Sequence, residues 1–530
     1  MSANTVEDIR QHTIKDIDAE LFEEILRART RVYHVGEPTP IQLLPLDKTL
    51  AQGCAVYVKR EDLGPINAYK WRGGYNATFV HTEKQIANGD SDITVVAASA
   101  GNHAQGVAMA ATKLGIQAKI FMPLATPLMK QTSVKKHGGN HVEIILTGDT
   151  YNEAGDAAKA YCKEHGHTYI HAFDDLYTIA GQATIADEVM LDSQGPFDIA
   201  FVQIGGGGMA AAVASWLKLH NPNITVIGVE GVDQASMKTS LAAGKPTTLN
   251  NVDTFCDGTA VTRPGDLTFA ICQKHIDEII TVTNEEVCAA IQRCWEGLRV
   301  IPEPSGAMGL AGLIQYADNH FESLENKKLL SILCGANMDF GKLSLVASKS
   351  AIGAHQRRYV RFHMEEKTGG LLGLLEKYFK DISVSEFLYG KLDDTKAWPT
   401  IALDASPETM ESLEEKLTKA GMTFEDVTLD PDVRYKIINY NPALFKNPLL
   451  MHVHFPERKG ALRDFLRTVS EYSSICYFNY AYSGESIGRA LMGFEFGADE
   501  AKQKFLEKIK ESVVNCRPVE DSVAKRILQQ

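Results

Sequence analysis

No apolar stretch of the sequence approaches the roughly 20 residues that a helix needs to span a bilayer. The chain also lacks a basic tract, and its formal net charge of −13 argues against nucleic acid and anionic membranes as partners. The N-terminal segment carries several acidic residues and no apolar core, so we expect neither a signal peptide nor a transit peptide.

Cysteine is scarce as well. The 530 residues include nine cysteines, an odd number, and none of them forms a CxxC pair. This pattern disfavours a disulfide framework or a zinc site, and it is typical of free thiols in a reducing compartment. We therefore expect a cytoplasmic protein without a structural metal.

What the sequence does contain is ordinary globular material, with 44% hydrophobic and 23% charged residues. Between Ala55 and about Asp339, short β-branched runs alternate with helical patterns, which predicts a doubly wound α/β fold with parallel sheets. The glycine-rich loops then stop, and a strand–helix pattern occurs twice with a period of about 90 residues. We predict one domain at 1–350 and two smaller α+β subdomains at 356–440 and 446–530.

Lys70 stands where a strand pattern, Ala55 to Val58, leads through a turn-rich segment into a helical pattern. Asn67 is a favourable N-cap, which would place Lys70 in the first turn of the helix. Acidic residues are the usual choice there, because the helix dipole makes that end positive. The dipole and partial burial would lower the pKa of the amine and favour a nucleophile. The alternative is an ordinary solvated lysine.

Two further loops follow buried strand patterns, as expected at the carboxyl edge of a parallel sheet, where α/β proteins bind ligands. The first, Ser99 to Gly106, follows Ile93 to Ala98 and opens a helix. Its backbone donors, hydroxyl, amide and imidazole suit a carboxylate. His103 considered alone is more often a structural histidine than a base.

The second loop is the run of four glycines from Gly205 to Gly208, between a strand pattern and a helix. Backbone N–H groups free of Cβ atoms at a helix N-terminus form an anion cradle, and phosphate is the natural ligand. Two alternatives remain. The run also fits a dinucleotide fingerprint, Gly205-x-Gly207-x-x-Ala210, with Glu230 as the ribose acid. The glycines can also serve helix–sheet packing alone.

Two shorter segments complete the set. Glu303 to Ala307 is a turn entering a helix, and Cys334 ends another strand pattern, where a buried cysteine is usually a core residue. A nucleophilic lysine, a phosphate cradle and a carboxylate loop at strand ends match one cofactor, pyridoxal phosphate, which carries an aldehyde, a phosphate and an electron-accepting ring. An amino acid substrate would supply the carboxylate.

These motifs resemble those of the biosynthetic threonine dehydratases, which are fold-type II pyridoxal-phosphate enzymes. The resemblance runs from about Arg31 to the end of the chain. It implies a catalytic domain of two doubly wound parallel-sheet subdomains, followed by a pair of ACT-like regulatory subdomains. It also implies conversion of L-threonine to 2-oxobutanoate and ammonia, the first step of isoleucine biosynthesis, in a homotetramer. The matching motifs are Ala98 to Gly106, Ala180-Gly181-Gln182, Gly205 to Gly208, Glu303 to Ala307 and Gly335-Ala336-Asn337.

The resemblance also implies roles for single residues. Lys70 would bind the cofactor covalently and then act as the base on the substrate Cα. Asn102 would contact the ring oxygen, and Cys334 would face the ring nitrogen, where the family has a serine. The phosphate site would comprise Gly205, Gly206, Gly207, Gly208 and the amide of Met209. The substrate carboxylate site would comprise Ser99, Ala100, Gly101, Asn102 and His103.

The segment around the lysine departs from the family pattern Ser-Phe-Lys-x-Arg-Gly-Ala, because it reads Ala68-Tyr69-Lys70-Trp71-Arg72-Gly73-Gly74. Met209 stands where a leucine is common. These changes leave two alternatives open: a dehydratase for L-serine or another β-hydroxy amino acid, and a weakly active regulatory paralogue. Ala100 favours a lyase over the related serine racemases, which have a serine there.

Each half of the C-terminal region has a loop that ends in glycine before a helix, Glu365 to Gly370 and Pro456 to Gly460. Backbone donors at a helix start suit the carboxylate of an amino acid. Each half also carries an aromatic strand. We expect isoleucine or valine as an effector; the alternative is that these subdomains only mediate assembly. The expected pocket residues are Phe387, Tyr389, Phe478 and Tyr480.

Overall fold

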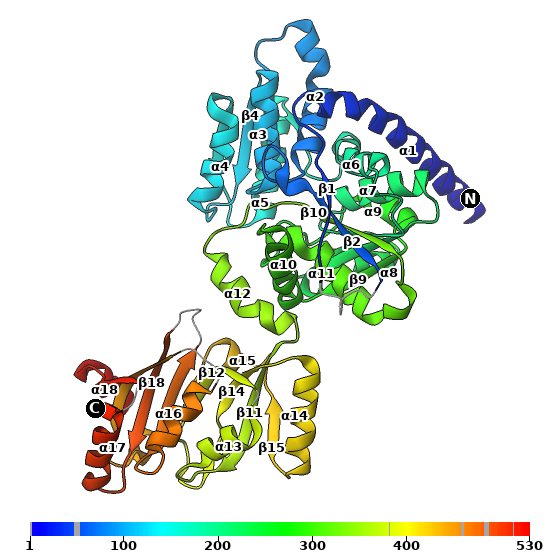
Figure 1. Ribbon diagram of the computed structural model, residues 1–530. Coiled ribbons are helices and arrows are strands. Elements are labelled where there is room, and N and C mark those ends of the chain that lie inside the picture. The colour runs from blue at the N-terminus through cyan, green and yellow to red at the C-terminus, as the bar shows by residue number, and fades with distance from the viewer. Residues whose placement is uncertain are drawn as a thin grey trace. The chain divides into compact units, whose positions relative to one another are not determined.

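The computed structural model describes residues 3–46, 53–380, 382–456, 460–481, 487–511 and 514–529. The chain divides into two compact units, Met1–Gly353 and Ala354–Gln530 (Figure 1). In this described part, no helix is long and apolar enough to cross a membrane.

The first unit contains two sheets. The larger has the order β1 (Ile41–Leu43), β2 (Ala55–Arg60), β10 (Lys328–Leu333), β7 (Ile199–Gln203), β8 (Thr225–Gly231) and β9 (Glu278–Val282). The smaller has the order β5 (Val142–Leu146), β4 (Gln117–Met122), β3 (Thr94–Ala98) and β6 (Thr168–Tyr169). All pairings are parallel except that of β1 with β2. The predicted fold class, with two parallel-sheet α/β subdomains, is confirmed, and β1 is an antiparallel edge strand that we did not expect.

Helices alternate with these strands along the chain. They are α1 (Ala3–Val32), α2 (Trp71–Asn88), α3 (Asn102–Leu114), α4 (Leu128–Gly138), α5 (Tyr151–His165), α6 (Leu176–Leu191), α7 (Gly208–His220), α8 (Ser236–Ala243), α9 (Asp266–His275), α10 (Asn284–Leu298), α11 (Pro304–Asn319) and α12 (Lys342–Gly353).

Apolar layers cover both faces of the larger sheet. Helices α1, α6, α7 and α9 contribute to one layer, and α10 and α11 contribute to the other. Alternate residues of β7 face the two layers: Ala200 and Val202 pack on one side, and Ile199 and Phe201 pack on the other. A strand buried on both faces leaves only its carboxyl end free to hold a ligand, which is where β7 turns into α7.

The second unit is built on one antiparallel sheet. Its first half comprises β11 (Arg357–Glu365), α13 (Gly370–Tyr378), β12 (Ser383–Gly390), β13 (Lys396–Ala397), β14 (Thr400–Asp404), α14 (Pro407–Lys419), β15 (Thr423–Asp426) and α15 (Pro431–Arg434). Its second half comprises β16 (Leu449–Pro456), α16 (Ala461–Val469), β17 (Ser474–Ala481), β18 (Ile487–Glu495), α17 (Asp499–Glu511), β19 (Asn515–Pro518) and α18 (Asp521–Leu528).

The repeat in the second unit is a βαββαβ module. The sequence pattern predicted βαβ-type halves and missed β15 and β19, because these strands are polar and largely exposed. The two halves join where β12 pairs with β17, which sets Phe387 opposite Tyr480 and Tyr389 opposite Phe478. The separation into subdomains 356–440 and 446–530 stays a prediction.

Candidate active site

Lys70 occupies the N-cap position of α2, which begins at Trp71. Our prediction that Asn67 caps this helix is therefore wrong. Asn67 has a positive φ of 53°, its N–H donates to the carbonyl of Gly64, and its own carbonyl accepts the N–H of Ala336. The backbone of Asn67 is used to bind the loop after β10, and this delays the helix until Trp71.

The segment that carries Lys70 is attached to the end of β10 by backbone hydrogen bonds. The N–H of Tyr69 donates to the carbonyl of Cys334 at 3.1 Å, and Ala68 forms an isolated antiparallel bridge with Gly335. The structure therefore brings the predicted lysine and the predicted ring-nitrogen partner into one place, although 264 positions separate them in the sequence.

The amine of Lys70 has the properties of a nucleophile. The residue is part-buried, and burial lowers the pKa of the amine, while the neighbouring Cys334 and Glu303 raise it. A lowered pKa leaves a larger share of the amine neutral at a working pH. The solvated-lysine alternative does not fit this environment.

A buried ionic cluster anchors the start of α2 directly behind Lys70. Arg72 is 0% exposed, and its guanidinium donates to Glu61 at 2.8 and 3.0 Å and to Glu188 at 3.0 Å. Lys59 donates to the same Glu188 at 2.6 Å. Opposite charges hold the pKa of Glu61 down at about 2 against the effect of its burial. The sequence analysis did not predict this cluster. Its one local signal is the arginine two positions after Lys70.

Trp71 stands at the variable position that follows Lys70 in the family pattern, and its ring lies against two glycines. A Cβ atom on Gly36 would lie 2.3 Å from its ring, and one on Gly64 would lie 2.6 Å from it. Its apolar neighbours include Val32, Ile66 and Met109. Trp71 therefore fills a space between the end of α1, the turn before α2, and α3.

The Ser99–His103 loop follows β3 and leads into α3, which begins at Asn102. The N–H of Gly101 donates to Oγ of Ser99 at 3.2 Å, which shapes the turn. His103 is 2% exposed, and its Nε2–H donates to the carbonyl of Ile170 at 2.9 Å. Burial lowers the pKa of His103 to about 3. Its imidazole therefore stays neutral and serves the packing of this lobe, which leaves its backbone N–H for a ligand.

The glycine run forms the turn between β7 and α7. Gly207 has a φ of 94°, and a Cβ on Gly206 would lie 2.4 Å from the ring of Phe173. The carbonyl of Gly206 accepts the hydroxyl of Thr268 at 2.6 Å. Within the described residues, no acceptor takes the N–H groups of Gly205, Gly206 and Gly207. The carbonyl of Gly206 is held by a hydrogen bond, and the N–H groups at the start of α7 are free. This arrangement matches an anion cradle.

Cys334 is 3% exposed, and burial raises the pKa of its thiol well above the ordinary value. Its Sγ lies 3.6 Å from the carbonyl of Ser305. Gln203 donates to the same carbonyl at 3.2 Å, and its Oε1 is buried with no partner among the residues described. A neutral thiol therefore stands at the end of β10.

The dinucleotide alternative does not fit this geometry. Glu230, which would bind a ribose, accepts the N–H groups of Met237 and Lys238 at 2.9 and 2.8 Å. Its carboxylate therefore caps α8 and is fully buried. A buried amine, a cradle of free amides and a neutral thiol on neighbouring strand ends instead fit pyridoxal phosphate.

The sequence analysis assigned no role to the side chains of Glu303 and Asn337, which both contact Asn102. The amide of Asn102 donates to Glu303 at 2.7 Å and accepts from Asn337 at 2.8 Å. Glu303 and Asn337 lie in motifs that we had singled out, Glu303 to Ala307 and Gly335 to Asn337, but no role had been given to their side chains.

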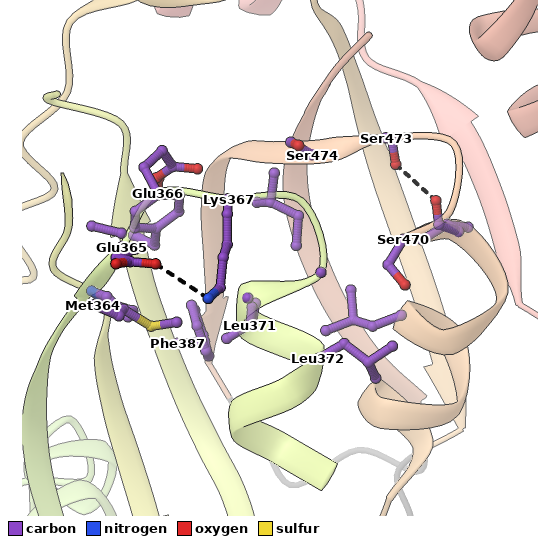
Figure 2. A pocket seen from close by; sticks show the side chains of 18 residues that line it. Met364, Glu365, Glu366, Lys367, Leu371, Leu372, Phe387, Ser470, Ser473 and Ser474 are labelled. Atoms are coloured by element: carbon purple, nitrogen blue, oxygen red, sulfur yellow. Dashed lines mark hydrogen bonds and ion pairs between the residues drawn. The ribbon is translucent and has the colours of Figure 1, made fainter. Parts of the chain in front are cut away.

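The second unit has a cavity, partly open to solvent, between the start of α13 and the end of α16. Figure 2 shows Glu365, Glu366 and Lys367 on one side and Ser470, Ser473 and Ser474 on the other. Glu365 pairs with Lys367 at 3.3 Å.

The aromatic residues predicted for the regulatory pocket separate into different places. Phe387 and Tyr389 line this first cavity, and Tyr480 lines a second one, at the start of α16. Phe478 stacks on Phe387 with a centroid separation of 4.5 Å and is fully buried. Part of the Pro456 to Gly460 loop, 457–459, lies outside the described residues.

Comparison with known proteins agrees with this site. Residues 32–335 match the family of pyridoxal-phosphate dependent enzymes, and residues 443–527 match the C-terminal regulatory domain of threonine dehydratase. The chain is 38% identical to a biosynthetic L-threonine dehydratase of Haemophilus influenzae, over 90% of this chain and 91% of that protein. It is 36% identical to that of Escherichia coli, over 91% of this chain and 92% of that protein.

Solved structures agree as well. The processed form of threonine deaminase isoform 2 from Solanum lycopersicum is similar with a TM-score of 0.57 and 38% identity, over 63% of this chain and 89% of that chain. Maize serine racemase is similar with a TM-score of 0.56 and 31% identity, over 63% of this chain and 98% of that chain. The chain therefore belongs to the pyridoxal-phosphate dependent enzymes and, among them, to the biosynthetic threonine dehydratases.

Proposed function

We propose that this protein converts L-threonine to 2-oxobutanoate and ammonia, with pyridoxal phosphate bound at Lys70. The observation that carries the proposal is the position of Lys70: its segment is hydrogen-bonded to the Cys334 loop, and Asn337 beyond that loop contacts Asn102 at the start of α3. The names of the curated relatives, threonine dehydratases, support L-threonine as the substrate.

Bound pyridoxal phosphate supplies an aldehyde that reacts with amines and a ring that accepts electrons from the substrate Cα. Lys70, whose pKa is lowered by burial, is suited to take the Cα proton and hold it on Nζ. The amides of Gly205, Gly206, Gly207, Gly208 and Met209 at the start of α7 would hold the phosphate.

The remaining roles follow from the other two loops. Backbone N–H groups in the segment from Ser99 through Ala100, Gly101 and Asn102 to His103 would bind the substrate carboxylate at the start of α3. Cys334, which burial keeps protonated, would face the ring nitrogen with a neutral group. A neutral partner would leave that nitrogen unprotonated, which would favour elimination over side reactions such as transamination.

The segment around Lys70 bears on the choice between threonine and serine. Tyr69 lies beside the site, because Lys70 Nζ is 5.8 Å from the centre of its ring, whereas Trp71 packs against Gly36 and Gly64. Tyr69 is therefore one departure that bears on substrate preference. We expect kcat/KM for 2-oxo acid release to be higher with L-threonine than with L-serine. A preference for serine would favour the alternative dehydratase, and release from neither would favour the weakly active paralogue.

We also infer that the first cavity of the second unit binds isoleucine or a similar branched amino acid. Leu371, Leu372 and Phe387 offer apolar surface for the side chain. Tyr389 donates to Glu366, and burial raises the pKa of that carboxyl. An incoming ammonium group would stabilise the ionised form of Glu366. The backbone N–H of Gly369 would bind the carboxylate, because the N–H of Gly370 already donates to the carbonyl of Lys367.

Two further inferences concern assembly and location. We infer a homotetramer from the resemblance to the family, and a cytoplasmic location from cysteines that are all free. Light scattering of the purified protein measures the mass of the assembly, and a value other than four chains would contradict the first inference.

A further inference from the structure

A chain of three hydrogen bonds crosses the site beside Lys70. The amide of Asn337 donates from Nδ2 to the carbonyl of Ile66 at 2.7 Å and to Oδ1 of Asn102 at 2.8 Å. Nδ2 of Asn102 in turn donates to Oε1 of Glu303 at 2.7 Å. These residues come from four separate segments: the turn before α2, the loop after β10, the start of α3 and the start of α11.

The direction of this chain is determined by its first member. A backbone carbonyl can only accept, so the atom of Asn337 that lies against Ile66 is the NH₂ group. Its two hydrogens are then used by Ile66 and Asn102, which makes Oδ1 of Asn102 the acceptor. Nδ2 of Asn102 must therefore face Glu303. One N–H of Asn102 is left, and no acceptor among the described residues takes it.

Glu303 is the acceptor at the other end of this series of hydrogen bonds. It is the N-cap of α11 yet makes no side-chain cap bond, and its backbone N–H donates to the carbonyl of Gly335 at 3.0 Å. The residue is 6% exposed. Burial and the nearby Asp257 raise its pKa to about 7, against the opposing effects of Asn102, Lys70 and Lys130. Burying a carboxyl group lowers the stability of the fold, and Glu303 does not regain that stability by capping α11. Its side chain instead accepts a hydrogen bond from the amide of Asn102.

We propose that Glu303 and Asn337 are positioning residues that hold the amide of Asn102 so that its remaining N–H is an obligatory donor toward the group bound at Lys70. The proposal rests on the proposed function, because pyridoxal phosphate carries a ring oxygen that accepts hydrogen bonds when ionised. An amide free to rotate would present its own oxygen to that atom in part of the molecules, which costs affinity. The three bonds exclude that orientation.

Asn337→Asp provides the sharpest test, because it replaces the hydrogen-bond donor at position 337 by an acceptor with little change in size. A carboxylate cannot donate to Oδ1 of Asn102 and instead attracts Nδ2. Glu303→Ala removes the acceptor at the other end, whereas Glu303→Gln keeps an acceptor oxygen. Glu230→Gln is the matched control, since Glu230 is also buried and also has its pKa raised to about 7, but it binds α8.

The measurement is a titration of cofactor-free protein with pyridoxal phosphate, together with the pH dependence of the absorption band of the bound cofactor. We expect Asn337→Asp and Glu303→Ala to weaken binding by about tenfold or more, equivalent to about 1.4 kcal/mol, and to shift the pH dependence of the band. Glu303→Gln and Glu230→Gln should remain within about threefold of the natural protein, which is within the spread of a single weak contact.

The outcomes distinguish a failure of the proposed function from a failure of the positioning role. If the natural protein binds no pyridoxal phosphate, the proposed function fails. If it binds and both Asn337→Asp and Glu303→Ala keep the natural affinity and pH dependence, the positioning role is wrong. Circular dichroism of the cofactor-free proteins reports folding. If Asn337→Asp is unfolded, the comparison of Glu303→Ala with Glu303→Gln decides, and equal affinities for that pair overturn the proposal.

Discussion

At the scale of single residues, the site works by controlling protons through burial. The amine of Lys70 loses affinity for its proton, and the thiol of Cys334 keeps its proton, for the same reason: both charged forms are poorly solvated. In the function that we propose, Lys70 is the base and Cys334 is the ring-nitrogen partner, and burial favours the neutral form of both. The charges that the site does contain lie behind it, in the cluster of Lys59, Arg72 and Glu188.

Cys334→Ser tests the ring-nitrogen partner. A hydroxyl is a stronger hydrogen-bond donor than a thiol, and it restores the family residue, so turnover should be kept or increased. Cys334→Asp should place a charge at the ring nitrogen and increase side reactions such as transamination. Product analysis from threonine measures both effects. Loss of cofactor binding in a folded Cys334→Ser variant would show that this residue has been misplaced.

Glu230 gives a prediction for the pH dependence of stability. Burial raises its pKa from 4.5 to about 7 in the folded protein. Between these values the folded form holds a proton that the unfolded form has lost, so this group lowers the free energy of unfolding as pH rises. Glu230→Gln should flatten that decline. Urea unfolding at several pH values measures it, and parallel curves for the two proteins would contradict the assignment.

At the scale of elements, strand ends and helix starts carry the site, and the sequence reveals them unevenly. The predicted strand Ile93 to Ala98 corresponds to β3, Thr94–Ala98, because a buried apolar run is visible in the local sequence. The strands β15 and β19 were missed because polar edge strands have no such pattern. The start of α2 was misplaced because Asn67 is bound by Ala336, a partner that no local pattern reveals.

The same contrast applies to the site. The glycine run and Lys70 could be singled out because their chemistry is local. The contact between Asn102 and Glu303 joins residues 201 positions apart, so it depends on how the two sheets come together. Motif reading found both segments and could not pair their side chains.

Gly206→Ala tests the turn between β7 and α7. A Cβ at Gly206 would lie 2.4 Å from the ring of Phe173, so the turn must shift, and overpacking of this kind typically costs about 1–3 kcal/mol. We expect affinity for pyridoxal phosphate to fall at least about tenfold. Gly155→Ala in α5 is the control, because its Cβ has no neighbour within 4 Å. Titration of both variants decides, and Phe173→Ala combined with Gly206→Ala should recover part of the loss.

At the scale of the whole molecule, the chain joins a catalytic unit to a unit that contains a cavity suited to an amino acid. The second unit has its own apolar core, which includes Phe362, Phe387 and Phe494. An effector bound there influences turnover only if it binds two states of the protein with different affinities.

L-isoleucine should raise the threonine concentration needed for half-maximal rate. Coupling between separate sites is typically worth about 1–3 kcal/mol, which corresponds to a shift of about 5- to 150-fold. A chain that ends after Gly353 should keep turnover and lose the response. Initial rates at several isoleucine concentrations measure the effect. Equal sensitivity in both proteins, or none in either, would show that the second unit is no isoleucine sensor.

The central claim is that Lys70 holds pyridoxal phosphate for reaction with L-threonine, and an absorbance spectrum with and without L-threonine tests it most directly. The natural protein should be yellow, its band should change when threonine is added, and 2-oxobutanoate should accumulate. Lys70→Ala should fold, show no turnover, and yield no cofactor-labelled peptide after borohydride reduction, whereas the natural protein is labelled at Lys70. A colourless natural protein, or a coloured one whose spectrum ignores threonine and releases no 2-oxo acid, would contradict the account.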